Sequence, residues 1–102
     1  MKATNRRQRE MAQALRDLVP LVTYADSVPI LEATRRPHMR NLAPVDAVFL
    51  ATVAQIRHAH TDYDELLEQG YDHESARYFV ADQIDNVLRD WGSSRGLEGD
   101  AV

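Results

Sequence analysis

An almost uninterrupted apolar run, from Leu42 to Ile56, limits the possible folds of this chain more than any other segment. The 15 residues of the run include only three polar side chains, those of Asp46, Thr52 and Gln55. A membrane-spanning helix needs about 18 or more apolar residues, so we expect no membrane span. Pro44 suits the first position of a helix, and a helix that is apolar nearly all round lies inside a core. We therefore predict a central helix over about residues 44–60.

Length and composition are those of one small all-α domain. The chain has 102 residues, the size of a single core, and 44% of them are hydrophobic. It contains no cysteine, which excludes disulfide bonds, thiolate metal ligands and a cysteine nucleophile. We predict a compact bundle of four to five helices as one domain in residues 1–92, followed by a disordered C-terminal tail in residues 93–102.

Four further helices are expected around the central one, each begun by a capping residue and ended by proline or glycine. They are a first helix capped by Thr4 or Asn5 and ended before Pro20, a second capped by Asp26 or Ser27 with Pro29 in its first turn and ended at about Arg36, a fourth over 62–69 ended by Gly70, and a fifth capped by Asp72 and ended by Gly92. The fifth helix carries the clearest apolar stripe, and this stripe includes Trp91.

The central helix is expected to break near His60. A continuous helix over residues 44–69 would be about 39 Å long, whereas a domain of this size is only about 30 to 35 Å across. Thr61 followed by Asp64 resembles a capping box with aspartate in place of glutamate, which favours a new helix start there.

Charge is divided unevenly along the chain. Residues 1–40 contain eight Lys and Arg against four Asp and Glu, whereas residues 41–102 contain four arginines against twelve acids. The two halves could therefore face each other, within one chain or across a dimer. The basic half could instead contact nucleic acid, although the net charge of −4 argues against a dedicated nucleic-acid binder.

The densest group of chemically active side chains lies at the end of the central helix. This candidate polar cluster, with one residue added from the fifth helix, comprises Arg57, His58, His60, Thr61, Asp62, Tyr63, Asp64 and Arg77. A metal or hydrolase-like site would use His58, His60, Asp62 and Asp64. The two histidines are two residues apart and so point in different directions on a helix, which favours a network of helix-terminus interactions over a metal site.

A second group is basic and lies on the expected loop between the second and third helices. Its candidate anion-binding residues are Arg35, Arg36 and Arg40. Guanidinium groups suit phosphates and carboxylates, although a charged loop is more often simply solvated. If the chain contacts nucleic acid, we expect it to use Arg6, Arg7, Arg9, Arg35, Arg36 and Arg40.

Several separated motifs resemble a known family. Ile56-Arg57-His58, Thr61-Asp62-Tyr63-Asp64, Ala76-Arg77 and Trp91 follow one another as in a bacterial domain of unknown function that is also found in fungi. The segments from Tyr24 to Ile30 and from Arg35 to Pro44 are similar to its bacterial branch. The resemblance covers about residues 18–92 and implies no activity. The positions that correspond to the family pattern are Arg57, His58, Thr61, Tyr63, Asp64, Arg77 and Trp91.

These observations favour a small cytoplasmic domain that acts by binding. The first hypothesis is a non-catalytic helical protein, without a cofactor, that forms a homodimer or binds another protein. The alanine-rich central helix and the opposite charges of the two halves motivate it. The alternatives are the metal site in the polar cluster and nucleic-acid contact through the basic half. No nucleophile with a positioned base and no glycine-rich phosphate loop is evident in the sequence.

Overall fold

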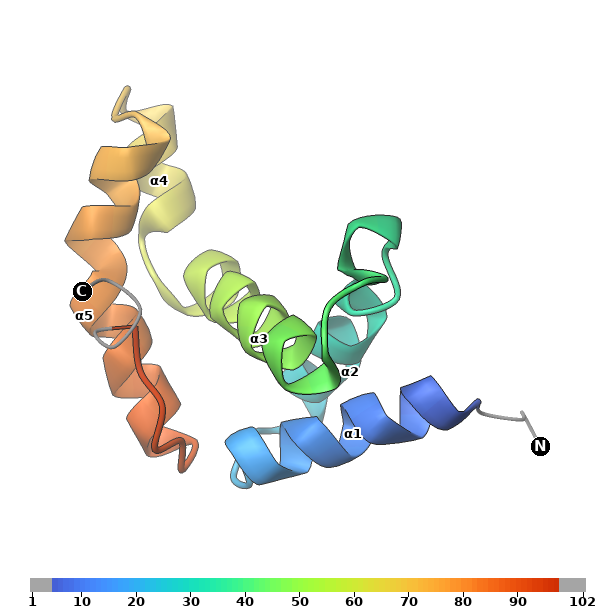
Figure 1. The fold of residues 1–102 in the computed structure, drawn as a ribbon. Coiled ribbons are helices and arrows are strands. Elements are labelled where there is room, and N and C mark those ends of the chain that lie inside the picture. The colour runs from blue at the N-terminus through green and yellow to red at the C-terminus, as the bar shows by residue number, and fades with distance from the viewer. Residues whose placement is uncertain (1–4, 98–102) are drawn as a thin grey trace.

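The computed structural model describes residues 5–97 and is helical throughout its regular elements (Figure 1). In chain order these are α1 (Arg6–Leu18), α2 (Tyr24–Ala33), the short 3-10 helix η1 (Pro37–Met39), α3 (Pro44–His60), α4 (Tyr63–Glu68) and α5 (His73–Asp90). The expected all-α bundle of four to five helices is confirmed. No described helix is both long and apolar enough to cross a membrane.

Helix α3 is the centre of the core, as its sequence predicts. It packs against α1, α2, α4 and α5, and its bounds are those expected, with Pro44 at the start. Val48 and Ile56 are fully buried, and the small side chains of Ala47 and Ala51 are buried where neighbouring helices approach. The remaining buried apolar residues come mainly from the facing sides of α1 and α5.

The predicted break near His60 is confirmed, because α3 ends at His60 and α4 begins at Tyr63. Thr61 has an extended backbone, with φ −135° and ψ 174°, and its hydroxyl donates to the carbonyl of Arg57 in the last turn of α3. The expected capping box with Asp64 is wrong. The N-cap of α4 is Asp62, and the Thr61 hydroxyl accepts from the backbone N–H of Tyr63. The hydroxyl thus meets the first N–H of α4 and not that of Asp64, three residues on, which a capping box requires.

Helix α2 starts earlier than predicted. Thr23 is its N-cap and accepts from the N–H of Asp26, so Pro29 lies within the helix. Proline lacks the N–H that would bond to the carbonyl of Ala25, which is an exposed residue. The helix also ends earlier, at Ala33, and η1 occupies part of the expected loop.

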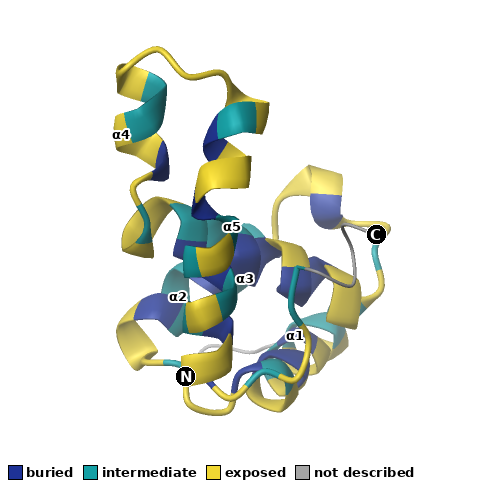
Figure 2. Ribbon diagram, turned by 90° about the vertical axis from the view of Figure 1, so that its left-hand side faces the viewer, coloured by how far each residue is buried: buried dark blue, intermediate teal, exposed yellow. Residues whose placement is uncertain are grey.

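Helix α4 and the amino-terminal half of α5 form a hairpin, here called the arm, that projects beyond the rest of the bundle (Figure 1). The molecule measures 44 × 27 × 26 Å, and the arm and the amino-terminal end of α1 lie at opposite ends of it. Gly70, at φ 104°, closes α4 with hydrogen bonds from Gly70 and Tyr71 to the carbonyls of Leu67 and Leu66. Figure 2 shows exposed positions over much of the arm's outer surface.

The carboxyl end of α5 returns to the bundle. Trp91 is buried, as predicted, and Gly92 ends the helix at φ 89°. The expected tail starts at residue 93, and its first part lies along the body. The backbone N–H of Leu97 donates to Asp85, and the Arg95 guanidinium carbon lies 3.7 Å from the centre of the Phe49 ring. Residues 98–102 of the expected tail lie outside the described residues.

Candidate functional sites

The predicted polar cluster divides into two groups on different sides of α3. His58 and His60 are only two residues apart, so they point to different neighbours, as helical geometry requires. His58 faces α4, where its Nδ1 lies 2.8 Å from Oδ1 of Asp64. His60 faces α2, where its Nε2 lies 2.9 Å from Oδ1 of Asp26. These two histidine–aspartate pairs differ strongly in burial. The Asp64 side chain is 57% exposed, and that of Asp26 is 11% exposed.

The outer group is centred on Tyr63, the first residue of α4. Tyr63 is buried, its hydroxyl is hydrogen bonded to Nδ1 of His73 at 2.8 Å, and the His58 ring meets it edge-on at 5.5 Å. The Arg57 guanidinium carbon lies 5.4 Å from the centre of the same ring. Tyr63 therefore joins the end of α3 to the start of α5 through rings and hydrogen bonds.

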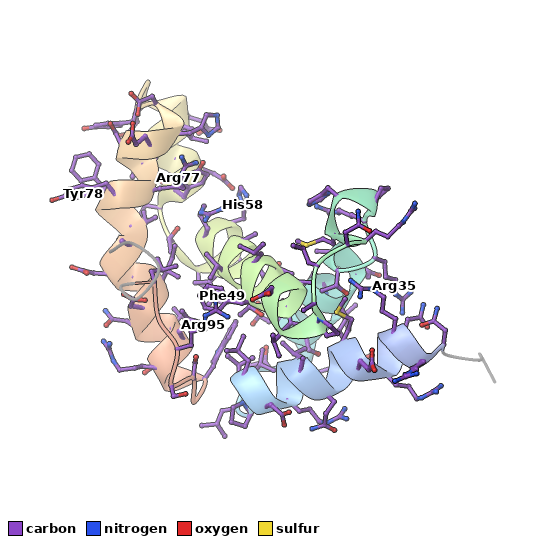
Figure 3. The ribbon with its side chains drawn as sticks, viewed as in Figure 1. Arg35, Phe49, His58, Arg77, Tyr78 and Arg95 are labelled. Atoms are coloured by element: carbon purple, nitrogen blue, oxygen red, sulfur yellow. The ribbon has the colours of Figure 1, made fainter. Side chains whose placement is uncertain are left out.

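Arg57 is the most constrained cation of the outer group. Its Nε atom is buried and has no hydrogen-bond partner among the described residues. Burial lowers the pKa of Arg57, Tyr63 opposes this shift, and the positive charge of Arg77 adds to it. Arg77 itself is exposed and lies on the α5 side of the group (Figure 3). The side chains of Arg57, His58 and His73 all contact Tyr63, and these contacts stabilise the junction of α3, α4 and α5.

The inner group surrounds the carboxylate of Asp26. Besides His60, the amide of Gln55 donates to Oδ1 at 3.0 Å and the hydroxyl of Thr23 donates to Oδ2 at 2.8 Å. Burial on its own raises the pKa of Asp26, but the hydrogen bonds from Gln55, His60 and Thr23 and the charge of His60 outweigh it and hold that pKa below its usual value. The edge of the His60 ring contacts Trp91, with centroids 5.6 Å apart. The inner group therefore connects α2, α3 and the end of α5.

The four residues of the metal hypothesis do not meet at one point. His58 and His60 bind different aspartates, and only one of these, Asp64, belongs to the hypothesis. Asp62 caps α4 through its backbone and makes no side-chain capping bond. Within residues 5–97, no three His, Cys, Asp or Glu side chains converge as metal ligands.

The three candidate anion-binding arginines do come together. A pocket of about 390 Å³ between α1 and the carboxyl end of α2 is lined by Arg35, Arg36 and Arg40, and by Arg7 from α1. Figure 3 shows Arg35 on this side of the molecule. Part of the Arg7 guanidinium group is already hydrogen bonded within the chain, because its Nη2 donates to the carbonyls of Met39 at 3.0 Å and Leu42 at 2.8 Å. These bonds hold the loop that carries the other arginines against α1.

The arm carries a third feature, an exposed aromatic patch formed by Tyr71, Tyr78 and Phe79. Phe79 meets the ring of Tyr71 at 5.5 Å and that of Tyr78 at 5.7 Å. Tyr78 is 78% exposed and Phe79 is 55% exposed, and Figure 3 shows Tyr78 pointing away from the bundle. Glu74 and Asp82 lie one turn before and after Tyr78 on the same exposed helix face.

Sequence reasoning missed three features of these sites. Asp26 was expected only as a helix cap, and its contact with His60 joins residues 34 positions apart, which no local pattern indicates. The aromatic patch could have been recognised, because Tyr78 and Phe79 fall outside the apolar stripe of α5. Arg7 was expected among basic residues, but not its role in ordering the loop.

One family model matches most of the chain. It is described as an uncharacterized conserved protein (DUF2293), and it matches residues 14–92. The match includes all of the outer and inner groups and the arm, whereas Arg7 lies before it. No curated protein and no solved structure matches the chain.

Proposed function

The chain belongs to the DUF2293 family of uncharacterized conserved proteins, and we propose that it acts without catalysis, as a homodimer. In this dimer two copies lie antiparallel, and the acidic aromatic arm of each packs against the basic end of the other, which is the surface that carries Arg35, Arg36 and Arg40. The observation that carries the proposal is the exposed aromatic patch of Tyr71, Tyr78 and Phe79. Contiguous exposed aromatic rings are typical of protein interaction surfaces, where tyrosine, tryptophan and phenylalanine are enriched.

The charges around the patch favour a basic occupant. Glu74 and Asp82 flank Tyr78, are exposed, and form no ion pair among the described residues. On the opposite side of the molecule, Arg35 and Arg36 are also exposed and form no ion pair within residues 5–97. Within the described part of one chain, these two acidic and two basic side chains therefore remain without an oppositely charged partner. A second copy supplies the complementary charge.

An antiparallel pair also uses both contact surfaces of each copy, so it forms a closed dimer. The arm and the segment after α2 that carries Arg35 and Arg36 lie on opposite sides of the molecule (Figures 1 and 3). When one copy is reversed beside the other, both arm-to-basic-end contacts form at once, and a two-fold interface leaves no unpaired end from which a filament could grow. A bacterial source and a cytoplasmic location complete the proposal. Both rest on the sequence alone.

Sedimentation equilibrium tests the dimer. We expect reversible dimerisation that weakens at about 1 M salt, where the Debye length is about 3 Å. The double variant Tyr78→Ala/Phe79→Ala should be monomeric, whereas Tyr24→Ala, which removes an equally exposed tyrosine from α2, should dimerise normally. A chain that is monomeric at every concentration and salt, or equal effects of the patch and control variants, would refute the proposal.

A charge-swap experiment tests the arrangement within the dimer. Asp82→Arg and Arg36→Glu should each weaken the homodimer, because each places like charges at both contacts. Mixing the two variants should restore association. One contact in the mixed dimer then has reversed charges and the other has the original charges, so both are attractive. Failure of the mixture to associate more strongly than either variant alone would exclude the antiparallel arrangement.

A further inference from the structure

The pocket between α1 and α2 has the chemistry of a ligand site. Its rim carries the guanidinium groups of Arg35, Arg36 and Arg40, and none of its lining residues is acidic. The side chains of these three arginines make no hydrogen bond or ion pair with any described residue, so their guanidinium N–H groups are available to a ligand. Four guanidinium groups around one cavity, counting Arg7, repel one another unless an anion lies between them.

The neutral polar groups of the pocket are also donors. Asn5 and Gln8 form the capping box of α1, in which their side-chain oxygens accept from each other's backbone N–H at 2.7 and 3.3 Å. This leaves both side-chain NH2 groups without a partner among the described residues. The hydroxyl of Thr34 donates to the carbonyl of Leu31. The unpaired polar lining is thus rich in N–H donors, which suits a ligand rich in acceptor oxygens.

The remainder of the pocket is apolar. Met11, Ala12 and Leu31 also line it, so a bare inorganic anion would leave this apolar surface unused. A volume of about 390 Å³ falls within the range of about 300 to 1,000 Å³ that is typical of small-molecule sites. The ligand should therefore combine a phosphate with a larger, less polar body that covers the apolar surface.

We infer that this pocket binds a nucleoside phosphate. The phosphate lies among Arg35, Arg36 and Arg40, and the nucleoside lies over Met11 and Leu31. Guanidinium groups bind phosphate in a bidentate manner and stack on planar rings, so the same side chains can contact both parts of such a ligand. The phosphate could belong to a free nucleotide or to the 5′ end of a nucleic acid, because both present the same group.

Isothermal titration calorimetry with the full chain tests the inference. Adenosine monophosphate should bind more tightly than inorganic phosphate and more tightly than adenosine, because only the nucleotide uses both the arginines and the apolar surface. Arg35→Gln/Arg36→Gln should weaken this binding by about tenfold or more. The control Arg16→Gln/Arg89→Gln removes the same charge away from the pocket and should leave the affinity within about twofold. Equal losses in the two double variants, or no advantage of the nucleotide over inorganic phosphate, would overturn the site.

Two further titrations distinguish the source of the ligand and test the pocket independently of the dimer. A 5′-phosphorylated oligonucleotide that binds more tightly than its unphosphorylated counterpart, and at least as tightly as the nucleotide, identifies a nucleic-acid end. Weaker binding of the oligonucleotide identifies a free nucleotide. Titration into Tyr78→Ala/Phe79→Ala tests the pocket in a chain that lacks two of the three rings of the aromatic patch, so binding there supports the pocket even if the dimer proposal fails. Saturating nucleotide should also dissociate the dimer, an expectation that rests on the proposed function because the partner's arm would use Arg36.

Discussion

Replacing Asp26 by asparagine measures the contribution of the buried histidine–aspartate pair. The Asp26 carboxylate is only 11% exposed and accepts three side-chain hydrogen bonds, from Thr23, Gln55 and His60. A hydrogen bond to a charged group contributes about 1.5 to 3 kcal/mol, and contributions within one network do not add. Asparagine keeps the volume and one acceptor oxygen but removes the charge. We therefore expect Asp26→Asn to lower the free energy of unfolding by about 2 kcal/mol at pH 7, a decrease in Tm of about 8 to 16 °C.

Asp64→Asn is the matched control. Asp64 also pairs with a histidine of α3 and also lies in the first turn of a helix, but its side chain is 57% exposed. Exposed ion pairs contribute about 0 to 1 kcal/mol, so the loss should be below about 1 kcal/mol. The two variants differ mainly in burial, which is the quantity that the comparison tests.

The effect of Asp26→Asn should depend on pH in one direction. The pKa of Asp26 is lowered in the folded state, so its carboxylate stabilises the fold fully above the unfolded value of about 3.8. This stabilisation is lost as the pH falls through the lower folded-state pKa. Urea unfolding followed by circular dichroism from pH 7 to pH 2 should show the gap between wild type and variant closing only below about pH 4. A gap that is unchanged at low pH, or a loss for Asp64→Asn as large as that for Asp26→Asn, would refute this reasoning.

Four other substitutions test the fold itself by denaturant unfolding. Trp91→Ala should cost about 3 to 5 kcal/mol, because it removes the buried end of the α5 stripe, and a loss below about 1 kcal/mol would contradict that packing. Gly92→Ala should cost more than Gly70→Ala. Both glycines have positive φ, but an added Cβ lies 3.0 Å from Pro20 at Gly92 and meets nothing within 4 Å at Gly70. Equal losses of unfolding free energy in the two variants would show that Pro20 moves away from the added Cβ at no cost. Tyr63→Phe should cost about 0.5 to 1.5 kcal/mol through the lost hydrogen bond to the histidine that opens α5, and an unchanged stability would show that this bond is replaced by water.

Local sequence signals predicted most of the helices. Pro44, Gly70, Asp72 and Gly92 mark helix ends in the structure as they do in the sequence, because capping and left-handed backbone positions depend on one or two neighbouring residues. The break near His60 followed from the length of a continuous helix, whereas the capping box that was expected to support it was wrong. The start of α2 was wrong, because Thr23 and Asp26 are both good capping residues and local propensity does not choose between them.

The candidate sites were predicted less completely, and for a different reason. The sequence indicated that Arg35, Arg36 and Arg40 could bind an anion, since basic side chains close in sequence remain close in space. Whether they face a pocket or solvent depends on how α1 packs beside α2, and Arg7 makes this arrangement by bonding to carbonyls more than 30 positions away. The sequence thus predicted which residues could bind an anion, but it did not predict that they line one pocket.

The polar cluster shows the same division most clearly. Helical periodicity was sufficient to show that His58 and His60 diverge, because side-chain direction on a helix follows from residue spacing. Their partners depend on which helices lie on each side of α3. Asp64 is six residues from His58 and within reach of local reasoning, whereas Asp26 is 34 residues from His60 and meets it only because α2 packs against α3. Local backbone geometry thus follows from neighbouring residues, while burial, and with it the difference between an exposed pair and a stabilising one, arises only when distant helices exclude water together.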